Sequence, residues 1–454
     1  EPSSGKDGCF RLSDITGNIM EILMALNIKR PNGTEDITGR NICKWNTVER
    51  TVKDVAQEFG FREIRIPTFE NTELFQRSVG ETTDVVQKEM YSVIAKETKF
   101  TLRPEGTAGT IRAMLQNGML NEALPQKAFY ILSCFRHERP QAGRLREFHQ
   151  FGVEMAGSPL PSADADVILM ADTIISQLGI KNIELKINSI GCPKCRTEYH
   201  KALRSYFENR KDELCETCLS RLEKNPMRIL DCKSPVCSGI AKNAPVILDY
   251  LCDDCSDHFE KLKSYLKALG LSYTVDPKIV RGLDYYTKTV FEFVTTDIGA
   301  QGTICGGGRY DGLIEQLGGQ SVPALGFAMG LERLIMTMEN QGIEFDDDLG
   351  CTLYIAPMDQ NAVPYAMSIA KEIRSGGFQV EFDTIGRGLK AQMKYSDKIG
   401  AAFTLVLGDN EINSKTAKLK NMKTGEQTDI KLDDSLMENF SNIALDNMFG
   451  SLTD

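Results

Sequence analysis

Two long strand-like runs joined by a basic loop constrain the fold of this chain most. Pro125 precedes the strongly apolar run Ala128–Phe135, and the polar, glycine-bearing loop Arg139–Arg146 separates it from Glu147–Gly157. Apolar runs on either side of a turn-rich segment are typical of paired antiparallel strands. The pattern therefore predicts an antiparallel hairpin with a long basic loop.

Helices and short strands surround this hairpin in the sequence. Helical periodicity covers Ile42–Phe59, and a strand stopped by proline follows at Glu63–Pro67. After residue 264 strand-like sequence returns, and the features expected there are Lys288–Thr295, the glycine cluster Gly306–Gly312, and Ala324–Gly330 leading into the helix Leu331–Asn340. This mixture predicts an α+β domain with a central antiparallel sheet.

Between about Ile187 and Ser264 the sequence becomes charged, cysteine-rich and helix-forming, which we interpret as an inserted helical module. Eight of the chain's 13 cysteines lie there, mostly as close pairs: Cys192, Cys195, Cys215, Cys218, Cys232, Cys237, Cys252 and Cys255. In a large chain such pairs indicate reduced thiols or metal ligands before disulfides. They could supply one or two Cys₄ zinc sites, and the alternative is a helical module with reduced cysteines.

A different pattern follows the acidic linker Glu344–Leu349. The expected elements alternate between strand and helix: Thr352–Pro357, Ala362–Ser375, Gln379–Ile385, Leu389–Ile399 and Phe403–Leu407. A βαβαβ order predicts a mainly parallel sheet in a C-terminal α/β domain. Arg387, Lys390, Lys394 and Lys398 recur there at helical spacing as a basic ridge, which taken alone is more often a solvated face than an RNA contact.

Composition excludes several classes of protein. The 454 residues can bury a large core without disulfides, and 53 basic against 63 acidic residues give a net charge of −10, which argues against broad non-specific binding of polyanions. No apolar run approaches a membrane span, and residues 1–28 form an appendage with at most one helix, over Ile19–Leu26. The four histidines lack an H-E-x-x-H spacing, and Walker A and G-x-G-x-x-G patterns are absent.

The second strand of the hairpin carries an unusual polar face. Because side chains alternate along a strand, Phe148, Gln150, Gly152 and Glu154 point to one side. An unpaired buried carboxylate costs several kcal/mol, so this face needs partners. Either a neighbouring arginine satisfies it, or it is the floor of a polar ligand pocket in which the glycine leaves room for the ligand.

Further segments favour a ligand pocket. Arg136 and Glu138 follow the first strand, and Arg144 and Arg146 lie in the loop, a group that suits bidentate phosphate recognition. Leu102–Ala108 is typical of a turn entering a helix, where free N–H groups and a carboxylate could hold an amino acid. Arg281–Thr287 combines an arginine, an acid and two phenols, and the glycines of Cys305–Gly312 either form a turn or permit close approach of the backbone to a ligand.

These segments together resemble the bacterial type of histidyl-tRNA synthetase, a class II aminoacyl-tRNA synthetase family, over about residues 29–432. Motif 1 of the class resembles Gly60–Pro67 with Glu70, Leu74 and Phe75, motif 2 resembles Phe135–Glu154, and motif 3 resembles Gly326–Arg333. Arg281–Thr287 and Gly307–Leu313 resemble the two peptides peculiar to the histidine-specific branch. The chain departs from the family at Asn32, where the family usually has arginine.

The resemblance implies ligation of L-histidine to histidine tRNA, with ATP and Mg²⁺ and through a histidyl-adenylate. It places Arg136 and Arg281 on the α-phosphate and Arg333 on the triphosphate tail, with further ATP contacts from Arg144 and Glu138. The residues implied for histidine are Glu105, Thr107, Gln150, Glu154, Tyr285, Tyr286 and Tyr310. Those implied for tRNA are Gln141, Arg146, Arg387, Lys390 and Lys394.

The resemblance also implies domains and partners. The expected segments are the appendage 1–28, catalytic core 29–186 and 265–343, insertion 187–264, anticodon-binding domain 350–432 and a C-terminal helix or tail 433–454. Motif 1 carries the apolar residues Phe61, Ile64 and Ile66, which a monomer would expose as a patch, so we expect a cytoplasmic homodimer without membrane attachment. The alternative is that these residues fill the protomer's own core.

Two rival functions remain open at this point. One is a catalytically inactive paralogue that binds histidine for regulation; such paralogues lack the anticodon domain and lose motif arginines. The other is a purely structural RNA-binding scaffold, which leaves the Gln150 and Glu154 face unexplained. Arg136, Arg281, Arg333 and the C-terminal domain are all present here, which favours the enzyme.

Overall fold

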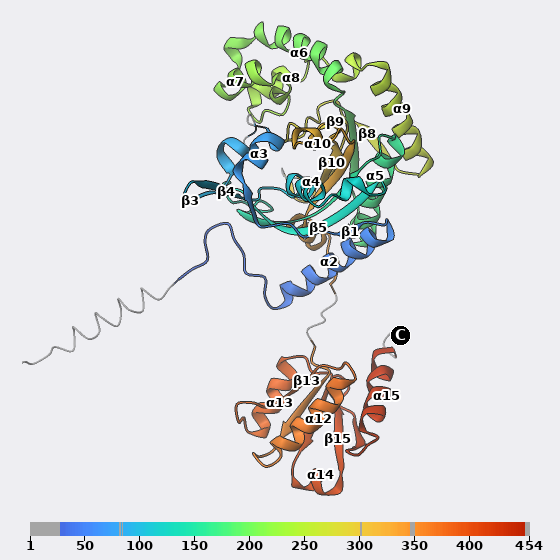
Figure 1. Ribbon diagram of the computed structural model, residues 1–454. Coiled ribbons are helices and arrows are strands. Elements are labelled where there is room, and N and C mark those ends of the chain that lie inside the picture. Colours follow the sequence, from blue (N-terminus) through green and yellow to red (C-terminus); the bar gives the residue numbers. More distant parts are fainter. Residues whose placement is uncertain (1–27, 81–82, 84, 300–301, 346–349, 450–454) are drawn as a thin grey trace, which may run out of the picture. The chain divides into compact units, whose positions relative to one another are not determined.

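The computed structural model describes residues 28–80, 83, 85–299, 302–345 and 350–449. They form two compact units, a large one with residues 45–344 and the segment before residue 38, and a small one with residues 38–44 and those from 345 onward (Figure 1). The helix expected over Ile19–Leu26 and most of the linker Glu344–Leu349 lie outside the described residues. Among the helices that are described, none is both long and apolar enough to cross a membrane.

An eight-stranded sheet is the centre of the large unit. Its strands, from edge to edge, are β1 (Arg62–Glu63), β5 (Gln126–Phe135), β6 (Glu147–Ala156), β11 (Ala324–Gly330), β10 (Thr303–Arg309), β9 (Thr287–Val294), β7 (Glu184–Ser189) and β8 (Tyr273–Val275). The strands from β5 to β7 pair antiparallel with their neighbours, and β1 and β8 join the edges in parallel. The predicted hairpin and the central antiparallel sheet are therefore confirmed.

The strand expected over Glu63–Pro67 is shorter than predicted, because β1 ends at Glu63. Arg103 explains the difference. Its guanidinium donates to the carbonyls of Ile66 (2.8 Å) and Pro67 (3.0 Å), and its Nε donates to Ser133 O (2.7 Å). A side chain thus satisfies carbonyl groups that a longer strand would have paired with backbone N–H groups.

Helices and a small second sheet surround the central sheet. The helices are α2 (Arg40–Glu58), α3 (Thr72–Val79), α4 (Thr107–Gln116), α5 (Pro161–Gln177), α10 (Leu313–Gln316) and α11 (Leu331–Asn340), with single turns at Val85–Glu89 and Met119–Asn121. The second sheet has the order β2 (Phe69–Asn71), β4 (Thr98–Leu102) and β3 (Ser92–Ala95). The predicted helices Ile42–Phe59 and Leu331–Asn340 correspond to α2 and α11.

The glycine cluster is a central strand and not a turn. Gly306 and Gly307 lie in β10, between β9 and β11. A Cβ on Gly307 would stand 2.3 Å from the carbonyl oxygen of Gly326 on β11, and one on Gly306 would stand 2.3 Å from the Arg281 guanidinium. The glycines therefore admit a neighbouring strand and an arginine of the chain itself.

The insertion is helical, as predicted. Its elements are α6 (Pro193–Glu208), η3 (Lys211–Glu213), α7 (Glu216–Lys224), η4 (Pro226–Ile229), α8 (Pro235–Ala241), η5 (Ile247–Tyr250) and α9 (Asp253–Ala268). Helices α6, α7 and α8 gather at one end of the large unit (Figure 1). Residues 187–189, which the sequence pattern assigned to the insertion, pair with β9 in the central sheet instead.

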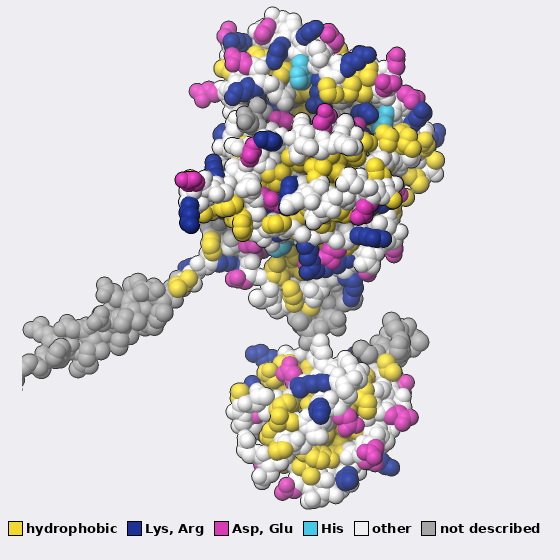
Figure 2. Space-filling view, viewed as in Figure 1, with side chains coloured by type: hydrophobic (Ala, Val, Ile, Leu, Met, Phe, Trp, Pro, Cys, Tyr) yellow, Lys and Arg dark blue, Asp and Glu magenta, His cyan; other side chains and the backbone are white. Residues whose placement is uncertain are grey.

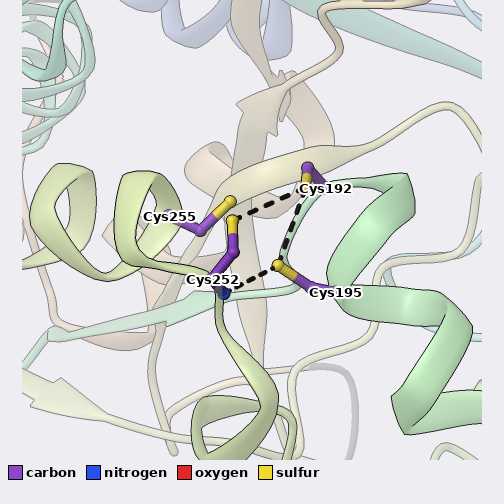
Figure 3. A group of neighbouring side chains, drawn as sticks. All are labelled: Cys192, Cys195, Cys252 and Cys255. Atoms are coloured by element: carbon purple, nitrogen blue, oxygen red, sulfur yellow. Dashed lines mark hydrogen bonds between the residues drawn. The ribbon is translucent and has the colours of Figure 1, made fainter.

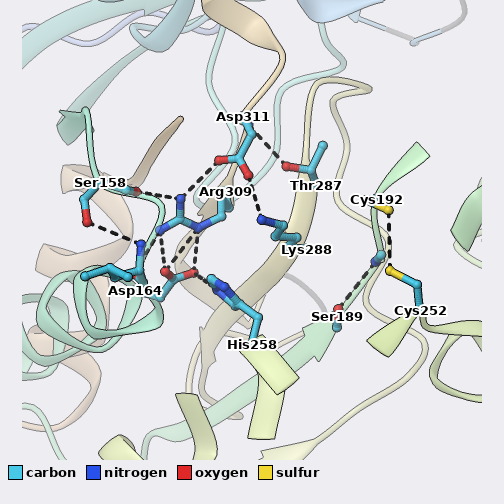
Figure 4. Close-up of polar contacts among 12 residues, drawn as sticks. Ser158, Asp164, Ser189, Cys192, Cys252, His258, Thr287, Lys288, Arg309 and Asp311 are labelled. Carbon is cyan, nitrogen blue, oxygen red and sulfur yellow. Dashed lines mark hydrogen bonds and ion pairs between the residues drawn. The ribbon is translucent and has the colours of Figure 1, made fainter. Parts of the chain in front are cut away.

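A buried polar network joins the sheet to helices α5 and α9. The Arg309 guanidinium, at the end of β10, is fully buried and pairs with Asp164 of α5 at 2.6 Å (Figure 4). Nε2 of His258 on α9 lies 3.4 Å from the same carboxylate. Arg309 also binds Asp311 at 3.1 Å and the carbonyls of Ser158 and Leu160, so all its charge is compensated within the core.

The small unit has a mixed sheet of order β13 (Val380–Phe382), β12 (Leu353–Pro357), β14 (Phe403–Leu407), β15 (Thr416–Asn421) and β16 (Gln427–Lys431). Its helices are α12 (Val363–Ser375), α13 (Leu389–Lys398), α14 (Asp409–Ser414) and α15 (Leu436–Phe449). The first three strands are parallel, as the βαβαβ pattern predicts. An antiparallel hairpin, β15–β16, extends the sheet and was not predicted.

Candidate active site

A cavity of about 250 Å³ lies against the central sheet, between β6, β10 and β11, the start of α4 and the loop 281–286. Most of the predicted site residues converge on it from distant parts of the sequence. Those that line it are Glu105, Thr107, Arg136, Glu138, Arg144, Gln150, Arg281, Tyr285, Tyr286, Tyr310 and Arg333. Of the polar face predicted on β6, Phe148 and Gln150 line the cavity, whereas Gly152 and Glu154 are not among its lining residues.

Glu154 is fully buried on β6, beneath a cluster of phenols. Its carboxylate accepts hydrogen bonds from the hydroxyls of Tyr130 (3.0 Å) and Tyr310, and the rings of Tyr285 and Tyr286 pack against that of Tyr310. The carboxyl group of Glu154 is thus satisfied by two tyrosines of the chain itself and not by the arginine considered for this face. Burial raises the pKa of the Glu154 carboxyl to about 8, against the hydrogen bond from Tyr310, which lowers it.

Tyr130 also corrects the interpretation of Gly152. The two residues are opposite each other on β5 and β6, and a Cβ on Gly152 would stand 2.3 Å from the phenol ring. The room that the glycine leaves is occupied by this tyrosine and not by a ligand. The sequence signal was the glycine opposite a large aromatic residue, which becomes visible only when the strand register is known.

Glu105 stands at the start of α4 and is fully buried. Its carboxylate accepts the backbone N–H groups of Thr107 (2.7 Å) and Ala108 (2.9 Å). The N–H groups that were expected to hold a substrate carboxylate are therefore taken by Glu105 itself. Burial raises the pKa of the Glu105 carboxyl, although these two hydrogen bonds favour the ionised form.

Arginines gather at the other side of the cavity. Arg136 donates from Nε to Pro104 O (2.9 Å), and its guanidinium lies 5.2 Å from the centre of the Phe148 ring. Arg333 donates to the carbonyls of Gly143 (3.0 Å) and Thr303 (2.7 Å). Burial, together with the charges of Arg144 and Arg136, lowers the pKa of Arg333. Cations that repel one another in a cavity favour an anionic ligand there.

Two carboxylates balance part of this charge. Glu138 forms an ion pair with Arg144, and Glu292 of β9 forms one with Arg281. The Arg281 guanidinium also lies 5.7 Å from the centre of the Tyr286 ring and against the backbone of Gly306. Glu292 was not predicted, although a single acid within the apolar run of β9 was a usable signal.

The residues predicted for tRNA lie outside the cavity lining. Gln141 and Arg146 are in the basic loop, where Arg146 donates to Glu138 O (3.1 Å) and Asn32 O (3.4 Å). In the small unit, Lys390 and Lys394 of α13 are exposed at one-turn spacing. Arg387 just before this helix pairs with Asp383 at 2.8 Å.

The eight cysteines of the insertion form two groups. Cys192, Cys195, Cys252 and Cys255 converge in the first, and Cys215, Cys218, Cys232 and Cys237 in the second. Within each group the four Sγ atoms lie within 4.8 Å of one another, and none of these residues is in a disulfide. The spacing of the cysteines in the sequence was compatible with one or two Cys₄ groups, and the fold brings the cysteines together as two.

Comparisons with known proteins agree with this geometry. Residues 33–334 match the family model for histidyl-tRNA synthetase, and residues 352–438 match that for an anticodon binding domain. The chain belongs to the histidyl-tRNA synthetase family. The function of this family is the aminoacylation of tRNA with histidine, and its class II catalytic fold is the one described above.

Close relatives cover nearly the whole chain. A histidine–tRNA ligase of Acetivibrio thermocellus is 54% identical over 89% of this chain and 97% of its own length. One from Caldanaerobacter subterraneus subsp. tengcongensis is 51% identical, with 89% and 98% covered. The crystal structure of apo histidyl-tRNA synthetase from S. aureus is 39% identical and superimposes with a TM-score of 0.78, covering 91% of this chain and 99% of that one.

The raised pKa of Glu154 predicts a pH dependence of stability. The folded chain holds the Glu154 proton more tightly than the unfolded chain does, so its contribution to stability is complete below the ordinary glutamate pKa and is lost as pH rises through about 8. Relative to Glu154→Gln, the free energy of unfolding should therefore fall between pH 5 and 8, by at most about 1.4 kcal/mol per pH unit. Urea unfolding of both proteins across this range measures it. Parallel pH profiles would contradict the buried, protonated carboxyl.

Proposed function

We propose that the cavity forms histidyl-adenylate from L-histidine and ATP, and that the chain then transfers the histidyl group to the terminal ribose of histidine tRNA. The observation that carries the proposal is that two kinds of side chain line one cavity. Phenols with the buried Glu105 make up a phenol cluster, and arginines make up an arginine cluster. The ammonium and imidazole groups of histidine are complementary to the phenol cluster, and a triphosphate is complementary to the arginine cluster.

The phenol cluster fits histidine. Glu154 and Tyr286 bind the imidazole in this proposal, with Tyr285 and Tyr310 lining the ring site. Support comes from burial, because Tyr285, Tyr286 and Tyr310 line the cavity and are at most 6% exposed, and Tyr310 donates to the fully buried Glu154. Glu105 accepts the α-ammonium. A polar group buried in this way rejects analogues that cannot hydrogen-bond to it.

Further contacts to histidine come from the edge of the same pocket. Gln150 joins Glu105 on the α-ammonium, and Thr107 lies beside it at the start of α4. Cys134 Sγ donates to Gln150 Oε1 at 3.4 Å, which fixes the amide and leaves its N–H₂ group oriented away from the thiol. Thr107 and Gln150 both line the cavity.

The arginine cluster fits ATP. Arg136 and Arg281 take the α-phosphate from two sides and Arg333 takes the triphosphate tail, while Arg144 and Glu138 lie beside them. Glu138 and Glu332 line the same cavity, and carboxylates with substrate phosphates are usual ligands of Mg²⁺. When bound, Mg²⁺ would neutralise charge on the β- and γ-phosphates.

The chemistry then follows from charge. The histidine carboxylate attacks the α-phosphorus, pyrophosphate leaves, and negative charge grows on the non-bridging oxygens. Arg136 and Arg281 are held in place by backbone and by Glu292, so they need no reorganisation in the transition state. Preorganised donors of this kind contribute about 3 to 4 kcal/mol each, and no protein nucleophile is required.

Recognition of tRNA uses surfaces outside the cavity. We assign the acceptor end to the loop with Gln141 and Arg146, and the anticodon to the small unit. The assignment of the small unit is supported by its match to an anticodon binding domain and by the exposed lysines of α13. The proposed aminoacylation of histidine tRNA would serve protein synthesis in the cytoplasm.

The proposed enzyme is a homodimer, but not through the residues expected at first. Phe61 and Ile66 are 2% and 7% exposed and fill the protomer's own core, so the argument from an exposed motif 1 patch was wrong. A different apolar face is exposed: Phe69 of β2 and Val93 of β3 are 54% and 57% exposed and lie on the same face of the small sheet as Phe100. Figure 2 shows hydrophobic side chains at this edge. A second copy of the chain would cover it.

The first prediction is that ATP–pyrophosphate exchange depends on histidine. Arg281→His should abolish the exchange while the fold stays intact, because Arg281 acts mainly in the transition state. A histidine-binding regulator or an RNA scaffold would show no exchange in the parent protein. Exchange by the variant at the parent rate would refute the role of Arg281.

Gly306→Ala tests the same arginine without removing it. The atoms nearest to the new methyl group are those of the Arg281 guanidinium, which it would push from its position beside Glu292, so kcat should fall by about 100-fold with little loss of thermal stability. Gly307→Ala is the contrast, because its methyl group meets the backbone of β11 and should lower stability instead. If Gly306→Ala retained the parent kcat, the position of Arg281 would not matter for the reaction.

The second prediction concerns tRNA. Lys390→Glu/Lys394→Glu should lower kcat/KM for tRNA in aminoacylation and leave pyrophosphate exchange unchanged. The slope of log Kd against log salt should fall by about two, one for each lost phosphate contact. Lys371→Glu/Lys418→Glu, at other exposed lysines of the small unit, is the control. Equal losses in both double variants would indicate a general effect of charge.

The third prediction concerns assembly. At micromolar concentration the protein should sediment at twice the chain mass of 50.5 kDa, and Val93→Asp should shift it toward the monomer. Met367→Asp, at a residue of similar exposure on α12, should leave the dimer unchanged. A fully active monomer in the parent protein would contradict the homodimer.

A further inference from the structure

The two cysteine clusters have the dimensions of a site for one metal ion each. In the first cluster Cys192 Sγ lies 3.6 Å from Cys195 Sγ and 3.9 Å from Cys252 Sγ (Figure 3). In the second, Cys215 Sγ lies 3.9 Å from Cys232 Sγ. A tetrahedral ion with Zn–S bonds of about 2.3 Å places its sulfurs about 3.8 Å apart. Disulfide sulfurs would be only about 2 Å apart.

The local backbone also favours thiolates. Cys192, Cys215 and Cys252 directly precede α6, α7 and α9, so their partners three residues later lie in the first turns of these helices. Helix N-termini stabilise negative charge. Backbone N–H groups donate to sulfur as well, from Cys252 to Cys195 Sγ (3.2 Å) and from Cys215 to Cys237 Sγ (3.3 Å).

Ordinary core packing does not account for this arrangement. Each cluster joins pairs distant in sequence, Cys192 and Cys195 to Cys252 and Cys255 in the first. Half of the eight cysteines are only partly buried, and their sulfurs face one another and not apolar side chains alone. Four sulfurs directed at one point are a ligand set, and tetrahedral S₄ sets select zinc or iron.

Each cluster is also next to an arginine that donates hydrogen bonds to the loop 281–286. Arg196 follows Cys195 directly and donates to Tyr286 O. Arg228 lies in η4, between Cys218 and Cys232, and donates to the carbonyls of Arg281 (3.3 Å) and Gly282. The loop 281–286 is therefore held from the insertion at both of its ends.

We propose that the two cysteine clusters bind one Zn²⁺ ion each, and that the ions fix Arg196 and Arg228 as positioning residues for the loop 281–286. Nothing in the chemistry of adenylate formation requires these ions to touch substrate. They would add metal cross-links to the hydrophobic core that the helices of the insertion already share with the rest of the unit. The part of this inference that concerns positioning rests on the function proposed for Arg281, whereas metal binding does not.

The second cluster shows most clearly how a bound ion would hold an arginine against the loop 281–286. Cys215 and Cys218 start α7, Cys232 follows η4, and a shared ion would close this segment into a rigid loop around Arg228. Arg228 is 9% exposed, and its Nε lies 3.4 Å from Asp284 in the same loop. Without the ion the segment between Cys218 and Cys232 loses its cross-link, and the contacts of Arg228 with the carbonyls of Arg281 and Gly282 lose their support.

Metal analysis of the full-length protein tests the binding. The parent protein should carry two zinc ions per chain, and Cys192→Ser and Cys215→Ser should each carry one. Cys351→Ser, at a buried cysteine outside the clusters, should retain two. Cobalt-substituted protein should show the absorption of tetrahedral Co²⁺ with sulfur ligands. Zinc-free parent protein, or iron in place of zinc, overturns the assignment whatever the catalytic activity.

A double-mutant cycle tests the positioning. Arg228→Gln should keep both zinc ions yet lower kcat for pyrophosphate exchange about tenfold, with KM for histidine changed by less than about threefold. Cys215→Ser should have a similar effect, and the double variant should lose little more than either. Arg204→Gln, which removes a comparable contact to Glu223 O, should exchange at the parent rate.

The outcomes of the cycle separate the two claims. Additive losses, or parent activity in either single variant, would refute the positioning role. Two bound zinc ions without any histidine-dependent exchange in the parent protein would refute the proposed function and leave the metal sites standing.

Discussion

The buried ion pair between Arg309 and Asp164 is the interaction on which the arrangement of the catalytic unit depends. It joins the end of β10 to α5, and His258 adds α9 at the end of the insertion (Figure 4). Burial alone would raise the pKa of Asp164, but contacts with His258 and Arg309 outweigh it and hold the pKa below its ordinary value. Removing one member of such a pair costs about 3–5 kcal/mol. The sheet, a covering helix and the insertion are thus fixed at one point.

β10 transmits this constraint to the site. Tyr310 directly follows Arg309 and donates to Glu154, and Gly306 on the same strand lies under the Arg281 guanidinium. One strand therefore contacts both the phenol cluster and the arginine cluster. Fixing the two clusters on a shared strand fixes the distance between the sites proposed for the imidazole and the α-phosphate, which is what a reaction between two bound substrates needs.

Much of this could be predicted from the sequence, because the long strands β5 and β6 have unambiguous periodicity. Alternation along β6 placed Gln150 and Glu154 on one face; Gln150 lines the cavity, and Glu154 reaches it through its hydrogen bond from Tyr310. The pattern did not predict Tyr130 as the partner of Glu154, since that contact depends on strand register. Phe61 and Ile66 were assigned to an interface because apolar residues of a surface patch and of a core look alike in sequence. The pairing of the cysteines into two clusters likewise required the fold.

The most direct test is whether a change in the phenol cluster affects the binding of histidine and leaves the binding of ATP unchanged. Histidine and ATP should be varied independently in pyrophosphate exchange by the parent protein and by Glu154→Gln. Loss of the Glu154 carboxyl should raise KM for histidine by about 100-fold and change KM for ATP little. Equal increases in both KM values, or none in that for histidine, would contradict the assignment of the buried carboxylate to the imidazole.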